Sequence, residues 1–254
     1  MNLWTVQLLG QFQLKDSAGV TQTFRTQKTA KLLAFLVFSH QKSHSRDLLA
    51  DMLWPESAPD KGRNSLRVAL YSLRQQLSIE NVENNEVLIC SSDTVQINST
   101  YFTVDTWQID DLLTHAKHCT NARQRLNYLE QIVQRNYGLF LQQYDDNWVM
   151  AERYYWQTLY LDTLHQLVNA FLELQQFTVA AAYAQMAVKA DPYAEQAHVD
   201  VMRAQVAMGR PVAARQQYLE LKRLFRQELN LPLSDFVCDI AKQFGLCNGS
   251  LTFL

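Results

Sequence analysis

Several motifs that mark enzymes and metal proteins are missing from this sequence of 254 residues. Its four cysteines, Cys90, Cys119, Cys238 and Cys247, form no CxxC pair, so we expect reduced thiols rather than a zinc or redox motif. There is no GxSxG and no GxxxxGK[ST] run, which argues against a hydrolase nucleophile elbow and against a nucleotide-binding P-loop. We therefore expect no catalytic residue and no cofactor.

Long apolar runs are missing as well. The first residues, MNLWTVQLLG, lack the basic start and the apolar length of a signal peptide. No segment reaches the length of a membrane span without a charged residue. We expect a soluble protein of the cytoplasm with no membrane partner.

Acidic residues are scarce in the first 78 residues. This part holds ten Lys and Arg against five Asp and Glu, whereas the rest of the chain is acidic and the formal net charge is −2. A near-neutral total therefore hides a basic N-terminal part. Such asymmetry indicates a polyanionic partner for that part.

The first hundred residues have the order of elements of a winged helix-turn-helix. Residues 3–14 alternate in polarity and predict a strand, and residues 20–25 can pair back on it in a small antiparallel sheet. Three helices and a β-hairpin follow, the hairpin over residues 86–98 around the turn SSD. The expected helices and N-caps are 27–40 after Thr26, 46–54 after Ser45, and about 58–79 with a Ser57–Asp60 capping box and Pro59 in its first turn.

The third helix carries the stretch DKGRNSLRVALYSLRQQL (60–77), which has an apolar side and a basic side. No acidic residue lies between Lys61 and Ser78, although an ordinary solvated face mixes charges because opposite charges at i, i+4 support a helix. The apolar side, which we expect to pack on the first two helices, holds Leu66, Ala69, Leu70, Leu73 and Leu77.

The basic side of this helix offers groups suited to DNA. Arginine forks, amides that can pair with adenine, and apolar groups that can contact thymine methyls all occur there. The alternative is a solvated basic helix without a partner. The candidate DNA-contact residues are Lys61, Arg63, Asn64, Arg67, Val68, Tyr71, Arg74 and Gln75.

Arg46 stands at the start of the second expected helix. Helix N-termini favour phosphate, so we expect Arg46 to contact the DNA backbone, with a solvated arginine as the alternative.

From Val104 onward the chain is expected to be helical almost to its end. Within residues 174–192, small residues sit at the spacing of the second helix of a tetratricopeptide repeat, and a shift of 34 places Ala180 on Ala214. The fold class that we predict is mainly α with a small β component. A winged helix-turn-helix over 1–100 precedes an all-α tetratricopeptide-like domain over 101–254.

Two other groups of residues invite a functional interpretation. His115 and His118 lie near Cys119, but no second pair completes a metal site, so we expect solvated or capping histidines and no metal. The aromatic run RYYWQTLY (153–160) is either a binding platform or inter-helix core. We expect core, built from Tyr154, Trp156, Tyr160 and Leu161.

Four segments together resemble the antibiotic-regulatory type of bacterial transcriptional activator: LLGQFQL, TQKTAKLLAFLVFS, RDLLADMLWPESAPDKGRNSLRVALYSLRQQL and DPYAEQAHVDVMRAQVAMGRPVAARQQYLELKRLFRQELNLPLS. The resemblance runs from Leu8 to about Ser234, and its most specific parts are ADMLWPE and MGRPVAARQQY. Proteins of that type join an OmpR-like winged helix to a bacterial transcriptional activator domain of tetratricopeptide-like helices.

The resemblance implies that the third helix enters the major groove, that the hairpin touches the adjacent minor groove, and that dimers bind direct repeats near promoters. It implies double-stranded DNA and RNA polymerase as partners, self-association on DNA, and a place in the nucleoid. The sequence departs from the type at Asn230, where a glycine is usual, and it shows no receiver or nucleotide-binding segment.

The function that we predict is therefore a sequence-specific DNA-binding transcriptional regulator, an activator, without enzymatic activity. The alternative is an adaptor that binds protein through its helical repeats, with a winged helix that does not read DNA.

Overall fold

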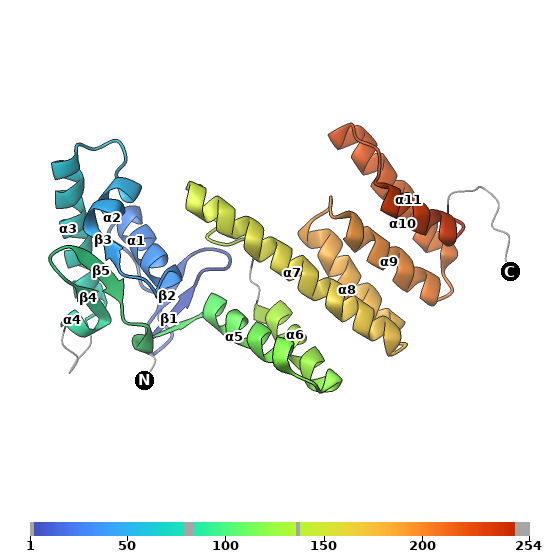
Figure 1. Ribbon diagram of the computed structural model, residues 1–254, viewed down its shortest axis with the longest axis horizontal. Helices are drawn as coiled ribbons and strands as arrows, with labels where there is room; N and C mark the ends of the chain where they lie inside the picture. The colour runs from blue at the N-terminus through green and yellow to red at the C-terminus, as the bar shows by residue number, and fades with distance from the viewer. Residues whose placement is uncertain (1–2, 79–83, 136–137, 247–254) are drawn as a thin grey trace. The chain divides into compact units, whose positions relative to one another are not determined.

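The computed structural model describes residues 3–78, 84–135 and 138–246, and the chain divides into two compact units. Unit 1 comprises Met1–Asp111 and Tyr137–Met150, and unit 2 comprises Leu112–Asn136 and Ala151–Leu254. The fold is mainly helical, as expected, and all strands of the described residues lie in unit 1 (Figure 1). The division at residue 100 stays a prediction, and the return of 137–150 to unit 1 was not anticipated.

The first sheet of unit 1 has the order β2-β1-β6. Strand β1 (Trp4–Gln7) pairs antiparallel with β2 (Gln13–Lys15) and parallel with β6 (Phe102–Val104). The single strand expected over 3–14 is wrong, because the chain turns at Gly10, whose φ of 93° suits glycine. Residues 20–25 pair back only through the bridge between Lys15 and Thr21.

Three helices form the middle of unit 1: α1 (Gln27–Phe38), α2 (Arg46–Leu53) and α3 (Pro59–Gln76). The predicted N-caps Thr26 and Ser45 are confirmed, since their side chains accept backbone N–H groups of the first helical turns. The Ser57 capping box is wrong. The N-cap of α3 is Ala58, without a side-chain cap, and Pro59 with its preset φ begins the helix.

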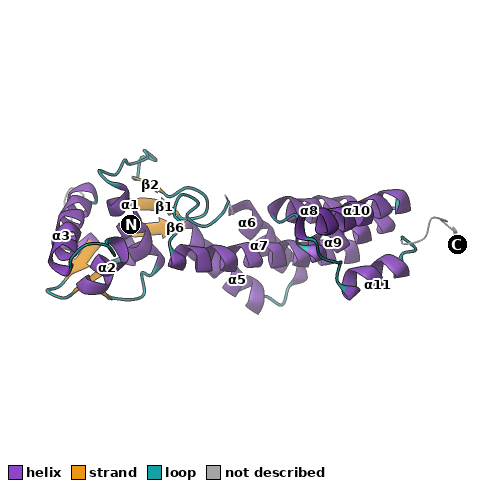
Figure 2. Ribbon diagram, turned by 90° about the horizontal axis from the view of Figure 1, so that it is seen from above, coloured by secondary structure: helices purple, strands orange, loops and turns teal. Residues whose placement is uncertain are grey.

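The second sheet has the order β3-β5-β4 and lies beside these helices (Figure 2). The expected hairpin is confirmed as β4 (Leu88–Cys90) and β5 (Thr94–Ile97), and β3 (His44–Ser45) pairs with β5 just before α2. A short helix α4 (Asn84–Val87) precedes the hairpin, and a 3-10 turn, η1 (Ser99–Tyr101), follows it.

A buried carboxylate joins the first sheet of unit 1 to helix α5 (Asp105–His118). Asp105 accepts hydrogen bonds from the backbone N–H groups of Leu8, Leu9 and Thr106 at 2.8–3.0 Å. These bonds take up the donors at the end of β1. Burial raises the pKa of Asp105 to about 6, against the lowering effect of the same hydrogen bonds.

The segment that returns to unit 1 is packed and hydrogen-bonded there. The backbone N–H of Gly10 donates to Leu139 O, and Leu141 N donates to Leu8 O. The side chain of Phe140 is fully buried. Trp148, at the start of α7 (Asn147–Glu173), stacks on Phe38 and meets Phe35 edge-on.

The helices of unit 2 pack as successive neighbours, α8 on α9 and α9 on α10. Helices α8 and α10 begin 34 residues apart, and Ala180 and Ala214 are both fully buried at the predicted equivalent positions. The remaining bounds are α6 (Ala122–Arg135), α8 (Phe177–Ala190), α9 (Glu195–Ala207), α10 (Pro211–Leu224), the π-helical turn η2 (Phe225–Leu229) and α11 (Asp235–Gln243).

Asn230 ends the π-helical turn with φ 53° and ψ 35°. This is the left-handed conformation, which glycine adopts freely and which asparagine tolerates better than most residues. The departure from the usual glycine therefore preserves the backbone conformation.

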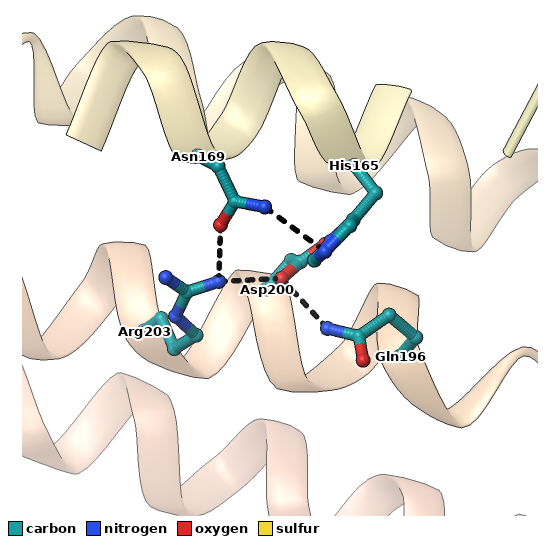
Figure 3. A network of polar contacts seen from close by, with 5 residues as sticks. All are labelled: His165, Asn169, Gln196, Asp200 and Arg203. Carbon is teal, nitrogen blue, oxygen red and sulfur yellow. Dashed lines mark hydrogen bonds and ion pairs between the residues drawn. The ribbon is translucent and has the colours of Figure 1, made fainter. Parts of the chain in front are cut away.

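A buried polar network links α7 to α9 (Figure 3). Asp200, 1% exposed, accepts hydrogen bonds from His165, Gln196 and Arg203, and Asn169 contacts both His165 and Arg203. No role was expected for His165. The expectation of solvated or capping histidines concerned His115 and His118, both of which are exposed. The sequence showed no signal for this network, because its members come from two helices.

Another histidine, His198 on α9, is buried. His198 contacts Pro192 O through Nε2 at 2.9 Å, and Gln217 Nε2 lies 2.7 Å from its Nδ1. Burial lowers the pKa of His198. His198 is therefore neither solvated nor a cap.

The aromatic run of α7 is divided between core and surface. Trp156 is buried and Tyr160 half-buried, as expected for core. Tyr154 is 75% exposed, so its assignment to the core is wrong. Consecutive residues on a helix point about 100° apart, so the run cannot face one way.

Candidate nucleic-acid interface

The outer face of α3 consists of the residues that the sequence singled out. The leucines and Ala69 of the opposite side are buried, and α3 packs against α1 and α2. Val68 and Tyr71 are 54% and 63% exposed, and at i, i+3 they are neighbours on the surface of the helix. The exposed members of this face are Lys61, Arg63, Asn64, Arg67, Val68, Tyr71 and Gln75.

Arg74 differs from the other candidates. Its side chain is half-buried, and its Nε atom is covered without a hydrogen-bond partner. The residue therefore lies at the border between the outer face and the core, and less of it is available to a ligand than of Arg67.

Asn64 and Arg67 lie one turn apart on the outer face. The NH1 group of Arg67 is 3.5 Å from Oδ1 of Asn64, a long contact that constrains neither side chain much. Both side chains can therefore reorient toward a ligand.

Arg63 is paired with an acid that the sequence reasoning missed. Its Nε and NH2 groups donate to Oδ1 and Oδ2 of Asp47 at 2.7 and 3.0 Å. Asp60 lies farther away, 3.8 Å from NH1. The hydrogen bonds from Arg63 lower the pKa of the Asp47 carboxyl below its usual value. No acid follows Lys61 within α3, but Asp47 reaches this face from α2.

A polar hollow of about 350 Å³ lies where α2, α3 and the β4–β5 hairpin meet. It opens at the N-terminus of α2, where backbone N–H groups and the helix dipole favour an anion. Arg46 at this N-terminus is half-buried, and its Nε is covered without a partner. The hollow is lined by Ser45, Arg46, Asp47, Arg63, Leu66, Arg67, Ser92 and Asp93.

The hairpin turn beside this hollow carries no cation. It consists of Ser91, Ser92 and Asp93, and the sequence has no Lys or Arg between Arg74 and Lys117. The implied contact of the hairpin with a minor groove would therefore depend on hydroxyl and backbone groups. It stays a prediction.

No group of three or more His, Cys, Asp or Glu side chains in the described ranges could hold a metal ion. Cys90, Cys119 and Cys238 are free thiols, and Cys247 lies outside the described residues. None of the helices in the described part of the chain combines the length and apolar character that a membrane crossing requires.

A family model described as the bacterial transcriptional activator domain matches residues 104–237. The chain belongs to this family. The description of the family model places this part of the chain among the domains of bacterial transcriptional activators. The activator domain match begins at the end of β6 and ends within α11, so it does not include α3.

The comparison with solved structures shows a likeness of fold beyond the activator domain. The chain is similar to Mycobacterium tuberculosis EmbR in complex with a low-affinity phosphopeptide, with a TM-score of 0.80 and 18% sequence identity. The match covers 96% of this chain and 65% of the EmbR chain. No curated protein sequence matches the chain.

Proposed function

We propose that the protein is a sequence-specific DNA-binding transcriptional activator in which unit 1 is an OmpR-like winged helix and α3 is its reading helix. The observation that carries the proposal is the outer face of α3. It exposes Arg67, Asn64, Val68 and Tyr71 together while the opposite side is buried. Membership of an activator family supports the same conclusion.

The proposed contacts divide by chemistry. Base edges in the major groove are read by Arg63, Asn64, Arg67 and Gln75, and thymine methyls by Val68 and Tyr71. Lys61 and Arg46 contact phosphates, Arg46 from the hollow at the N-terminus of α2. Arg74, half-buried, lies closest to the core and has the smallest role.

The remaining parts of the proposal follow the family. Unit 2 is a tetratricopeptide-like array, for which the 34-residue offset between α8 and α10 is the support. The chain is of the antibiotic-regulatory type, self-associates on direct repeats, contacts RNA polymerase and works in the cytoplasm at the nucleoid. The proposed division of domains is 1–100 and 101–254, with residues 101–111 and 138–150 of the second packing on the first.

The test begins with the full-length protein and a random duplex library, from which bound sequences are selected. Arg67→Ala and Asn64→Ala are then titrated on the selected duplex and on its single-base variants. Each variant is expected to lose about 1–3 kcal/mol of binding free energy and to relax the preference at one base pair.

Arg210→Ala is the matched control, because Arg210 is an exposed arginine of unit 2 and its loss changes the net charge equally. If Arg67→Ala and Asn64→Ala both keep the affinity and the selectivity, α3 does not read DNA. A protein that selects no sequence and shows no steep salt dependence would instead support the adaptor function.

A further inference from the structure

The pair Arg63–Asp47 has a geometry that restricts which atoms of the arginine can meet a ligand. The two hydrogen bonds to Asp47 use Nε–H and one hydrogen of NH2. A guanidinium carries five N–H hydrogens in a planar fork, so the edge formed by NH1 and NH2 keeps three of them. That edge shares NH2 with the Asp47 contact, but its outward N–H groups are not used by Asp47.

The remaining edge matches the acceptor pair of guanine. Arginine binds O6 and N7 of guanine with two parallel hydrogen bonds in the major groove. Arg63 lies in the N-terminal part of α3, the part of a reading helix that contacts base edges in helix-turn-helix proteins. Its side chain is 54% exposed, so a base edge can reach it.

Asp47 is suited to hold this arginine. It lies in the first turn of α2, where the helix dipole favours a carboxylate, and its two oxygens meet Arg63 in a two-bond contact. A free arginine loses rotamer freedom when it binds, whereas one that is already held loses less. Asp60 supplies no comparable contact, because its oxygen is 3.8 Å from NH1 and its side chain is almost fully exposed.

We propose that Asp47 is a positioning residue that fixes the Arg63 guanidinium so that its free edge reads one guanine. This inference rests on the proposed DNA binding and deepens it, because it assigns part of the sequence selectivity to a residue outside the reading helix. Asp47 touches no base in this proposal and acts only through Arg63.

The experiment is a double-mutant cycle with the full-length protein. Arg63→Ala, Asp47→Ala and the double variant are titrated on the duplex that the wild type selects, on its single-base variants and on an unrelated duplex. Asp47→Ala is expected to lose roughly 5- to 150-fold in discrimination at the same G·C pair as Arg63→Ala. The double variant is expected to lose no more than the larger single loss, since both changes remove one contact.

Two further variants and the unrelated duplex separate positioning from other effects. Asp60→Ala changes the net charge equally and is expected to keep the base preference. Asp47→Asn, close in shape, repeats the test in case Asp47→Ala folds poorly. Binding to the unrelated duplex is expected to stay equal or to tighten, because a negative charge has been removed.

Three results would overturn the proposal. Tighter binding of Asp47→Ala to every duplex with an unchanged base preference would make Asp47 only a neutralising charge. An equal loss on every duplex would make it only structural. Additive losses in the cycle would show that the two residues act separately. These results differ from a failure of the proposed function, because in that case the wild-type protein itself would prefer no duplex.

Discussion

Nδ1 of His165 on α7 lies 2.6 Å from Oδ2 of Asp200 on α9, where the carboxylate is almost fully buried. The imidazole therefore donates to an acceptor that water hardly reaches. This bond raises the pKa of His165, against the effects of burial and of Arg203. Asn169 opposes protonation of His165 at Nε2. Its Oδ1 accepts from Arg203, so its Nδ2 group is the one that faces Nε2 of the imidazole.

The pH dependence of stability should reveal this pair. The pKa of a histidine in the unfolded protein is about 6.5, and below that pH a histidine whose pKa is raised in the folded protein makes its full contribution to stability. This contribution is lost as the pH rises through the pKa of the folded protein. His165→Gln should therefore lower the melting temperature most at pH 5.5 and least at pH 8.5. Melting curves of both proteins across this range test it, and a constant difference would contradict it.

Loss of the Asp200 carboxylate should lower the stability of the protein more than loss of an exposed acid in the same unit. Asp200→Ala leaves His165, Arg203 and Gln196 without their shared acceptor, which should cost about 3 kcal/mol of unfolding free energy. Asp239→Ala is the control, because Asp239 pairs with Lys242 at the surface and should change stability by less than about 0.5 kcal/mol. Urea unfolding followed by circular dichroism measures both, and similar losses would refute the role of the network.

Asp105 should give unit 1 a pH dependence of its own. Its pKa of about 6 lies above the ordinary 3.8, so the folded state holds its proton more tightly than the unfolded state does. The contribution of Asp105 to the free energy of unfolding is therefore greatest at low pH. It falls by about 3 kcal/mol as the pH rises from about 4 to about 6.

Asp105→Asn removes the titration that causes this dependence. The variant should be less stable by about 1–3 kcal/mol at pH 4, because its amide presents N–H groups where Leu9 N donates. The part of the pH dependence between about 4 and 6 should disappear. Unfolding curves of the wild type and the variant at several pH values test this. If the free energy of unfolding depends on pH equally in both proteins, Asp105 does not titrate between about pH 4 and 6.

Arg46 should act on all DNA sequences alike. Arg46→Ala removes a cation at the N-terminus of α2, so the slope of log affinity against log salt concentration should decrease in magnitude by about one. Titrations of selected and unrelated duplexes at several salt concentrations measure it. A loss confined to the selected duplex would assign Arg46 to base readout instead.

A fragment of residues 1–100 should not fold. It lacks β6, the carboxylate of Asp105, and the side chains of Phe140 and Trp148, all of which belong to unit 1. A fragment of residues 1–150 contains them and should show a cooperative thermal transition. If 1–100 melts cooperatively, the returning segment is dispensable.

The role of unit 2 in cooperative DNA binding is therefore better tested with the whole chain on one-site and two-site duplexes.

Local signals in the sequence predicted the helices of unit 1 well. Thr26 and Ser45 were recognised as caps because a cap needs only a short polar side chain next to a periodic run. The buried and exposed sides of α3 followed from the helical period alone. Helices α8 and α10 begin 34 residues apart, which agrees with the shift seen in the sequence, and the tetratricopeptide-like array itself stays a prediction.

Contacts between distant segments were not predictable in this way. Asp47 lies 16 positions before Arg63, and Asp200 lies 35 positions after His165, so no pattern within one helix could reveal either pair. Strand β6 pairs with β1 across 98 positions, and its three residues carry too little periodicity to be recognised. Tyr154 was misassigned because an aromatic run suggests core even where its members point to different sides.

The return of residues 138–150 to unit 1 has a consequence for the order in which the protein can be completed during synthesis. The ribosome makes α6, which belongs to unit 2, before it makes Phe140 and Trp148, which belong to unit 1. At 5–20 residues per second, residues 112–150 take roughly two to eight seconds to make. During that interval the apolar side chains that Phe140 and Trp148 later cover, Phe35 and Phe38 among them, lack part of their packing. The nascent chain thus passes through a stage in which a chaperone has apolar surface to bind on a nearly finished domain.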